Sequence, residues 1–243
     1  MKVTLLSCTG MNDPNPDAAI NVLLYTKSTR LKMHPGLLAE IASWSPEKKA
    51  EEMEYMANTL PSSWEFVDYT FLIEGVTRAF THQLVRTRQA SYAQQAMRVV
   101  NVEGWEYATG PTIAGDPERN RIYREAMAAI AKAYDELIAA GASREDARGL
   151  LPTNILTNIN MKINMRNFVD LVKKRSTLRV QDEYRAVLDQ MVACVLAEHP
   201  WMSVFLSRSP LAAAKELDQE IDSISDPEKR MRMLKLANLM MQP

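Results

Sequence analysis

The sequence has few of the residues that most often build metal and redox sites. Its 243 residues include only two cysteines, Cys8 and Cys194, and three histidines, His34, His82 and His199. The cysteines do not form a CxxC pair, and the histidines do not lie at metal-ligand spacing. We therefore expect neither a disulfide framework nor a metal centre, and the two lone thiols favour a reducing, cytoplasmic setting.

Long apolar runs and glycine-rich loops are missing as well. No run of about 18 apolar residues occurs, so no membrane span is expected, and residues 1–14 are predicted to start a strand rather than a signal peptide. The motifs GxGxxG, GxxxxGK[ST] and GxSxG are absent, which excludes a Rossmann fingerprint, a P-loop and a nucleophile elbow. The formal net charge is −1, so overall charge gives no indication of a nucleic-acid partner.

Hydrophobic periodicity and capping residues predict a helix-rich α+β (or α/β) fold with few strands. Strands are expected over residues 3–7 and 67–73, whereas residues 155–163 suit either a helix or a strand. Gly75 is expected to end the second strand, and residues 102–115 to form a loop. Helices are expected over residues 17–25, 45–58, 76–85, 116–141, 143–149, 164–174, 180–198 and 229–240.

The chain does have arginines and amides close together. The segment VRTRQASYAQQAMRVV, residues 85–100, places Arg86, Arg88 and Arg98 next to Gln94 and Gln95. Guanidinium groups bind phosphates in a fixed fork geometry, and amides bind the polar edges of heterocycles. The cluster therefore suggests a phosphorylated heterocyclic ligand, although a solvated, salt-bridged helix face would have the same composition.

Three blocks of the sequence, in order, resemble those of the flavin-dependent thymidylate synthases. The segment from Glu74 to Val100 is similar to the family's Arg-His-Arg, seven residues, then Ser. Residues 145–152, EDARGLLP, resemble its arginine followed by Leu-Pro. Residues 164–175, NMRNFVDLVKKR, with VQDE ending at 183, resemble its Asn-x-Arg … Arg … Ala-Gln-x-Glu block. Together the blocks cover roughly residues 60–205.

The resemblance implies an enzyme that reductively methylates dUMP to dTMP. Methylenetetrahydrofolate would give the carbon, reduced FAD the hydride, and NADPH the electrons that reduce the flavin. It also implies a homotetramer with flavin sites at subunit interfaces, with no nucleic-acid or membrane partner. The expected fold is a single helix-rich domain with a small, mainly antiparallel sheet over residues 1–207, followed by a C-terminal helical extension over 208–243.

The resemblance also assigns roles to residues. It implies that Arg175 lies against the uracil edge, where a permanent charge would stabilise the anion that develops on the ring. The implied substrate-binding residues are Gln83, Leu84, Val85, Arg86, Gln94, Gln95, Ala96, Met97, Arg98, Arg148 and Arg175. The implied cofactor-binding residues are Ser63, Arg86, Thr87, Arg88, Gln94, Asn164, Met165, Arg166 and Asp170.

This chain departs from the family pattern at several of its motif positions. Thr87 replaces the histidine of Arg-His-Arg, Ala96 replaces the serine, and Pro61 and Phe66 occupy the places of two upstream histidines. Asp170 stands where the family often has asparagine. Three hypotheses stay open: reductive methylation of dUMP, hydroxymethylation of dUMP or dCMP on the same fold, and a catalytically silent nucleotide-binding or interaction protein.

A few other residues carry expectations of their own. Cys8 and Cys194 are expected to be small buried hydrophobes, which favours a mechanism with no enzyme nucleophile. His82 is expected either to orient a site arginine or to lie in the core, and Tyr92 to pack rather than to stack on a ligand. Residues 226–241 are rich in methionine and leucine on more than one side, so they are predicted to pack on the chain or on another subunit.

Overall fold

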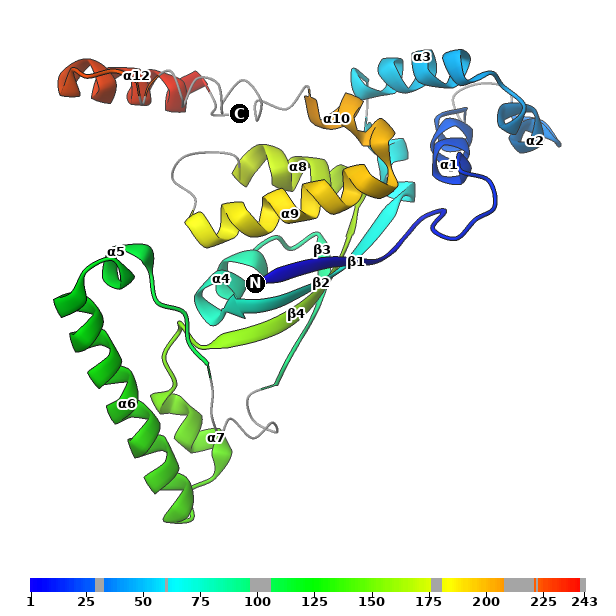
Figure 1. The fold of residues 1–243 in the computed structure, drawn as a ribbon. Helices are drawn as coiled ribbons and strands as arrows, with labels where there is room; N and C mark the ends of the chain where they lie inside the picture. The colour runs from blue at the N-terminus through cyan, green and yellow to red at the C-terminus, as the bar shows by residue number, and fades with distance from the viewer. Residues whose placement is uncertain are drawn as a thin grey trace. The chain divides into compact units, whose positions relative to one another are not determined.

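The computed structural model describes residues 1–28, 33–59, 61–96, 106–175, 181–207, 221 and 223–240 (Figure 1). The chain divides into two compact units. Unit one consists of residues 1–2, 72–88 and 92–161, and unit two of residues 3–71, 89–91 and 162–243. Helices and one small sheet together confirm the α+β class.

The sheet is antiparallel and has the strand order β1-β2-β4-β3. Its strands are β1 (Lys2–Cys8), β2 (Asp68–Thr77), β3 (Ala90–Gln94) and β4 (Leu156–Asn164). In β4 every second side chain is buried from Thr157 to Ile163. This period of two is that of a strand with one covered face, and it resolves the segment that the sequence left open between helix and strand.

Strand β2 continues past Gly75, so the expected break there is wrong. Gly75 has φ +63°, and a Cβ atom at this position would lie 3.1 Å from the backbone nitrogen of Met1. Glycine thus permits an unusual backbone and a close approach without ending the strand.

The Thr77 hydroxyl then accepts a hydrogen bond from the backbone N–H of Phe80 at 3.0 Å. This cap starts helix α4 (Arg78–Leu84) two residues later than predicted.

Unit two contains most of the buried aromatic side chains. The ring centroids of Tyr69 and Phe71 on β2 lie 5.7 and 5.8 Å from that of Phe168, which belongs to helix α8 (Met165–Arg175). The helices of this unit are α1 (Ala18–Lys27), α2 (Leu37–Ala42), α3 (Pro46–Ala57), η2 (Pro61–Phe66), α8 (Met165–Arg175), α9 (Asp182–Glu198), η4 (Pro200–Met202), α10 (Ser203–Ser207) and α12 (Pro227–Met240). Of these, α2, η2, η4 and α10 were not predicted from the sequence.

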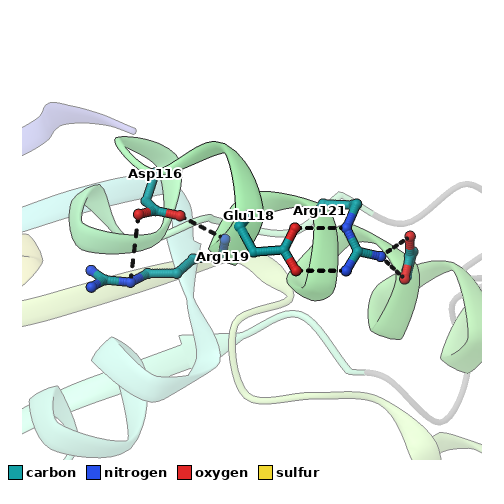
Figure 2. Close-up of polar contacts among 5 residues, drawn as sticks. Asp116, Glu118, Arg119 and Arg121 are labelled. Atoms are coloured by element: carbon teal, nitrogen blue, oxygen red, sulfur yellow. Dashed lines mark hydrogen bonds and ion pairs between the residues drawn. The ribbon is translucent and has the colours of Figure 1, made fainter.

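Unit one is built around helix α6 (Pro117–Ala139), whose start was predicted correctly. Asp116 caps it by accepting a hydrogen bond from the backbone N–H of Arg119 at 2.9 Å, and Arg121 bridges Glu118 and Glu125 (Figure 2). The unit also contains α4, α5 (Pro111–Ala114), α7 (Arg144–Ala147) and η3 (Arg148–Leu150). Helix α5 lies in the segment expected to be a loop, of which residues 102–105 are outside the described ranges.

None of the helices in the described ranges combines the length and the apolarity that a membrane crossing needs.

Candidate functional site

Helix α4 and the turn after it carry the first half of the arginine cluster. The backbone N–H groups of Arg78 and Ala79 donate to the carbonyl oxygens of Ile155 and Thr153, at 3.1 and 2.8 Å. These two bonds fix the start of α4 against the chain that leads into β4. The helix ends at Leu84, so Arg86 lies in the following turn and does not share a helix face with Arg78.

A tyrosine holds that turn in place. The Tyr92 hydroxyl lies 2.9 Å from the carbonyl oxygen of Leu84 and 2.8 Å from that of Thr87. The backbone N–H of Thr87 also donates to the Leu84 carbonyl at 3.0 Å. Tyr92 therefore packs against the turn, as predicted. Its contacts fix the backbone from which the side chains of Arg86 and Arg88 extend.

Strand β3 brings the glutamines next to α4. Gln94 donates from Nε2 to the hydroxyl oxygen of Thr81 at 2.9 Å, and the backbone N–H of Gln95 donates to the carbonyl of Asn158 at 3.2 Å. The sequence did not reveal this strand, because its five residues are mostly small or polar and it forms an edge of the sheet. The pairing with β4 is what makes it a strand.

Side chains around this turn differ in exposure. Val85, Arg86, Arg88, Gln95 and Ala96 are exposed, Gln83, Thr87 and Gln94 are half-buried, and Leu84 is buried. No described residue forms an ion pair with Arg86 or Arg88. His82 is exposed, so a core role for it is wrong. Met97, Arg98 and Trp105 lie outside the described residues.

Arg78 is a further candidate that the sequence reasoning missed. Its side chain is half-buried, and within the described ranges no acidic group pairs with it. Burial and, secondly, the positive charge of Arg148 lower the pKa of Arg78. Arg148 itself pairs with Glu145, Nη2 to Oε1 at 3.6 Å. Two guanidinium groups that repel each other favour the binding of an added anion beside them.

A sequence signal for Arg78 does exist. It is the first residue of α4, directly after the capping Thr77, and the first turn has no acidic residue. Helix starts favour negative charge because of the helix dipole, so an arginine there is electrostatically unfavourable by itself. This unfavourable position is the feature of the sequence that distinguishes Arg78.

In unit two the predicted residues lie at the junction of β4 and α8. Asn164 accepts a hydrogen bond through Oδ1 from the backbone N–H of Asn167 at 2.9 Å, which caps α8. Met165 is fully buried, and its N–H donates to the carbonyl of Val67 at 2.7 Å. Any ligand contact of Met165 would therefore use its carbonyl oxygen rather than its side chain.

Arg166 forms an ion pair with Glu65 of η2, which connects that short helix to α8. Ser63, one of the predicted cofactor residues, is half-buried in the same helix. Asp170 is half-buried one turn after Arg166 on α8. Three of the predicted cofactor residues, Ser63, Arg166 and Asp170, thus come from η2 and α8, which pack directly on each other.

Arg175 is in the last turn of α8, where the helix dipole favours a cation. Its guanidinium carbon lies 5.1 Å from the centroid of the Tyr184 ring, a cation–π contact that restricts its orientation. An arginine held in this way can present a fixed positive charge to a ligand. Residues 176–180, which follow it, are outside the described ranges.

Cys8 belongs to a partly buried cluster of polar side chains in unit two. The thiol lies 3.7 Å from Nε2 of His199, whose Nδ1 lies 3.1 Å from the Tyr69 hydroxyl. Burial raises the pKa of Cys8 to about 11, so its nucleophilic thiolate is scarce at neutral pH. The sequence predicted that Cys8 and Cys194 would be buried, but both side chains are only half-buried.

The comparison with known families places these residues in context. The model of the family described as "Thymidylate synthase complementing protein" matches residues 11–201. The chain belongs to this family. It is similar to the flavin-dependent thymidylate synthase of Clostridium tetani, with 32% identity over 79% of this chain and 81% of that protein. The synthase of Geobacter sulfurreducens is 32% identical over 86% and 88%, and that of Nitratidesulfovibrio vulgaris 34% over 70% and 75%.

The match to the thymidylate synthase complementing protein family includes every candidate residue from Ser63 to Arg175, in both units. Unit one holds Arg78, Gln83, Leu84, Val85, Arg86, Thr87, Arg88, Gln94, Gln95, Ala96 and Arg148. Unit two holds Ser63, Asn164, Met165, Arg166, Asp170 and Arg175. The match ends within η4, so α10 and α12 lie beyond the matched residues.

Proposed function

We propose that this protein is a flavin-dependent thymidylate synthase that methylates dUMP to dTMP. The proposal rests on family membership together with one observation: the matched region contains the half-buried Arg78, whose pKa is lowered by burial and by the charge of Arg148. Arg78 is close in sequence to the amides of Gln83 and Gln94. Methylenetetrahydrofolate is the proposed carbon donor, and NADPH the reductant of the flavin. We expect the enzyme to act in the cytoplasm, as a homotetramer with flavin sites at its subunit interfaces.

The cations of unit one suit a nucleotide monophosphate. Arg78 and Arg148 supply positive charge for the phosphate, and a phosphate bound there would end the repulsion between their guanidinium groups. The amides of Gln83, Gln94 and Gln95 can each donate and accept hydrogen bonds, as the pyrimidine edge requires. Leu84, Val85, Ala96, Met97 and Arg98 remain proposed contacts of the same nucleotide.

The chain also has groups that suit FAD, which carries two phosphates and a polar ring edge. Arg86 and Arg88 are exposed cations with no ion-pair partner in the described ranges, and Arg166 and Asn164 add donors in unit two. When bound, reduced FAD supplies the hydride for the transfer. Thr87 offers a hydroxyl where the family has an imidazole, so it can hydrogen-bond to a ligand but cannot carry a positive charge.

Arg175 is the proposed catalytic residue. Arginine cannot lose its proton in a protein, so it acts as a fixed positive charge and not as a base. Held against Tyr184, this charge would stabilise the negative charge that develops on the uracil ring when carbon 5 becomes nucleophilic. The raised pKa of the Cys8 thiol supports a route without attack by an enzyme thiolate.

A spectroscopic titration tests the proposal. The purified full chain is loaded with FAD, free flavin is removed, and the retained flavin absorbance is recorded while dUMP is added, with dCMP as the control nucleotide. Retained flavin whose spectrum changes with dUMP but not with dCMP supports the proposal. A chain that retains no flavin at any FAD concentration would contradict it.

A further inference from the structure

The short segment before β4 holds the start of helix α4. The backbone N–H of Ala79 donates a hydrogen bond to the carbonyl oxygen of Thr153 at 2.8 Å. The backbone N–H of Arg78 donates to the carbonyl oxygen of Ile155 at 3.1 Å. The N–H groups at a helix start have no partners inside the helix, so these two bonds determine where the backbone of Arg78 lies. Asn154 stands between the two accepting residues.

The side-chain amide of Asn154 connects this segment to helix α6. Its Nδ2 atom donates to the carbonyl oxygen of Ala108 at 3.1 Å and to the hydroxyl oxygen of Tyr123. The sulfur atom of Met127 lies 3.5 Å from the same nitrogen. Tyr123 and Met127 are four positions apart on α6, and residues at this spacing share a helix face. The amide of Asn154 therefore packs on one face of α6.

Tyr123 and Ala108 close the hydrogen-bond network around this amide. The Tyr123 hydroxyl donates to the Ala108 carbonyl at 2.9 Å, and the backbone N–H of Ala108 donates to the backbone carbonyl of Asn154 at 2.9 Å. Burial raises the pKa of Tyr123, although the hydrogen bond from Asn154 lowers it, so the hydroxyl keeps its proton and can donate at neutral pH. Each member of the network thus restricts the positions of the other two.

Helix α6 also packs on the element that carries Arg148. Arg148 is the first residue of η3, which contacts α6. Burial and, secondly, the charge of Arg148 lower the pKa of Arg78, so the two guanidinium groups are close enough to interact electrostatically. The same helix therefore supports Arg148 through η3 and Arg78 through Asn154. Their relative position decides whether one phosphate can contact both guanidinium groups.

We propose that Asn154 is a positioning residue of the nucleotide site and acts through Arg78. Its amide holds residues 153–155 on α6, and the carbonyl groups of these residues set where α4 begins. The inference rests on the proposed binding of the dUMP phosphate by Arg78 and Arg148. Asn154 need not touch the nucleotide. Without its amide the start of α4 would shift, and a bound phosphate would lose contact with one guanidinium group.

Asn154→Leu in the full chain tests the inference, because leucine keeps the approximate shape of asparagine, removes the N–H donors and adds no charge. We expect dUMP affinity, measured by calorimetric titration, to fall by about 2- to 30-fold. Asn160→Leu, the same change at an exposed side chain of β4, is the matched control and should leave the affinity unchanged. Thermal unfolding defines the temperature range in which both variants are folded.

A double-mutant cycle with Arg78→Met separates positioning of this arginine from a general loss of packing. If Asn154 acts through Arg78, then Asn154→Leu in the Arg78→Met chain should change the dUMP affinity by less than about twofold. A general loss of packing would weaken binding by the same factor in both backgrounds. Tyr123→Phe removes only the hydroxyl of the network, and should give a smaller loss with the same dependence on Arg78.

Unchanged dUMP affinity in a folded Asn154→Leu chain would overturn the inference. An equal loss with and without Arg78→Met would also overturn it. If Asn154→Leu does not fold, the same two criteria apply to Tyr123→Phe. An unsubstituted chain that binds no dUMP would contradict the proposed function and this inference together, so the two failures are distinguishable.

Discussion

At the scale of single residues, the pair of Arg78 and Arg148 carries the proposed nucleotide site. Two guanidinium groups that approach each other raise the energy of the folded chain, and the half-buried position of Arg78 reduces the screening of that repulsion. A doubly charged phosphate would convert the repulsion into two favourable charge-assisted contacts. Substitution at Arg78 should therefore act in opposite directions on binding and on stability.

We expect Arg78→Met to weaken dUMP binding by about 10- to 100-fold, because a hydrogen bond to a charged group contributes about 1.5–3 kcal/mol. Without nucleotide, its midpoint of thermal unfolding should be equal to or above that of the unsubstituted chain, because the repulsion from Arg148 is gone. Calorimetric titration and thermal unfolding measure the two effects. Arg124→Met, at an exposed arginine of unit one, is the matched control. Unchanged dUMP affinity in Arg78→Met would remove this residue from the site.

His199 predicts a pH dependence of stability. Burial lowers the pKa of His199 below its ordinary value of 6.5. Below about pH 6.5 the unfolded chain therefore binds a proton that the folded chain does not, so the free energy of unfolding falls as the pH drops below that value. Above about pH 6.5 the contribution of uncharged His199 to the free energy of unfolding is fully present. His199→Gln should flatten the profile between about pH 7 and pH 5, measured by denaturant unfolding. An equally steep profile in the variant would assign the dependence to other groups.

At the scale of elements, a partly buried ion pair links α3 to Asp17, the residue before α1. The Lys49 ammonium group lies 2.7 Å from Asp17 and 3.2 Å from the carbonyl oxygen of Ala42. The Lys49 side chain is 6% exposed, whereas that of Asp17 is 36% exposed. Loss of either partner therefore has a different cost. If Lys49 is replaced, water can still solvate the Asp17 carboxylate. If Asp17 is replaced, the Lys49 charge stays buried and poorly compensated.

We expect Asp17→Ala to lower the free energy of unfolding toward the lower end of about 3–5 kcal/mol, because it leaves a buried charge without its partner. Lys49→Met should change it by about 1 kcal/mol or less. Asp17 makes no side-chain capping bond to α1, so loss of a cap does not contribute. Urea unfolding of the two variants provides the comparison. If both variants lose the same free energy of unfolding, the uncompensated Lys49 charge is not what destabilises the Asp17→Ala chain.

The elements also show what a sequence can predict. Ser45 and Asp116 cap α3 and α6 through bonds to residues three positions away, so these starts were predicted from local sequence alone. The continuation of β2 past Gly75 and the edge strand β3 were not predicted, because both depend on contacts with residues distant in the chain. Arg86 was named as a candidate because of its motif. Arg78 was missed because its significance depends on Arg148, seventy positions later.

At the scale of the whole molecule, the chain belongs to a family through residues that lie in both of its compact units. Helix α6 of unit one exposes Ile122 and Leu137, at 55% and 41%, which favours its burial in an assembly. We predict that sedimentation equilibrium of the full chain gives the mass of four chains. A monomer at micromolar concentration would contradict the proposed homotetramer.

The most direct test of the central claim is the mass of the nucleotide product. The full chain is incubated with dUMP, methylenetetrahydrofolate, FAD and NADPH, and the nucleotides are analysed by mass spectrometry. Our account predicts dTMP, formed only when all four components are present and lost in Arg175→Gln. Unchanged dUMP from a chain that retains flavin, or a hydroxymethylated nucleotide in place of dTMP, would contradict it.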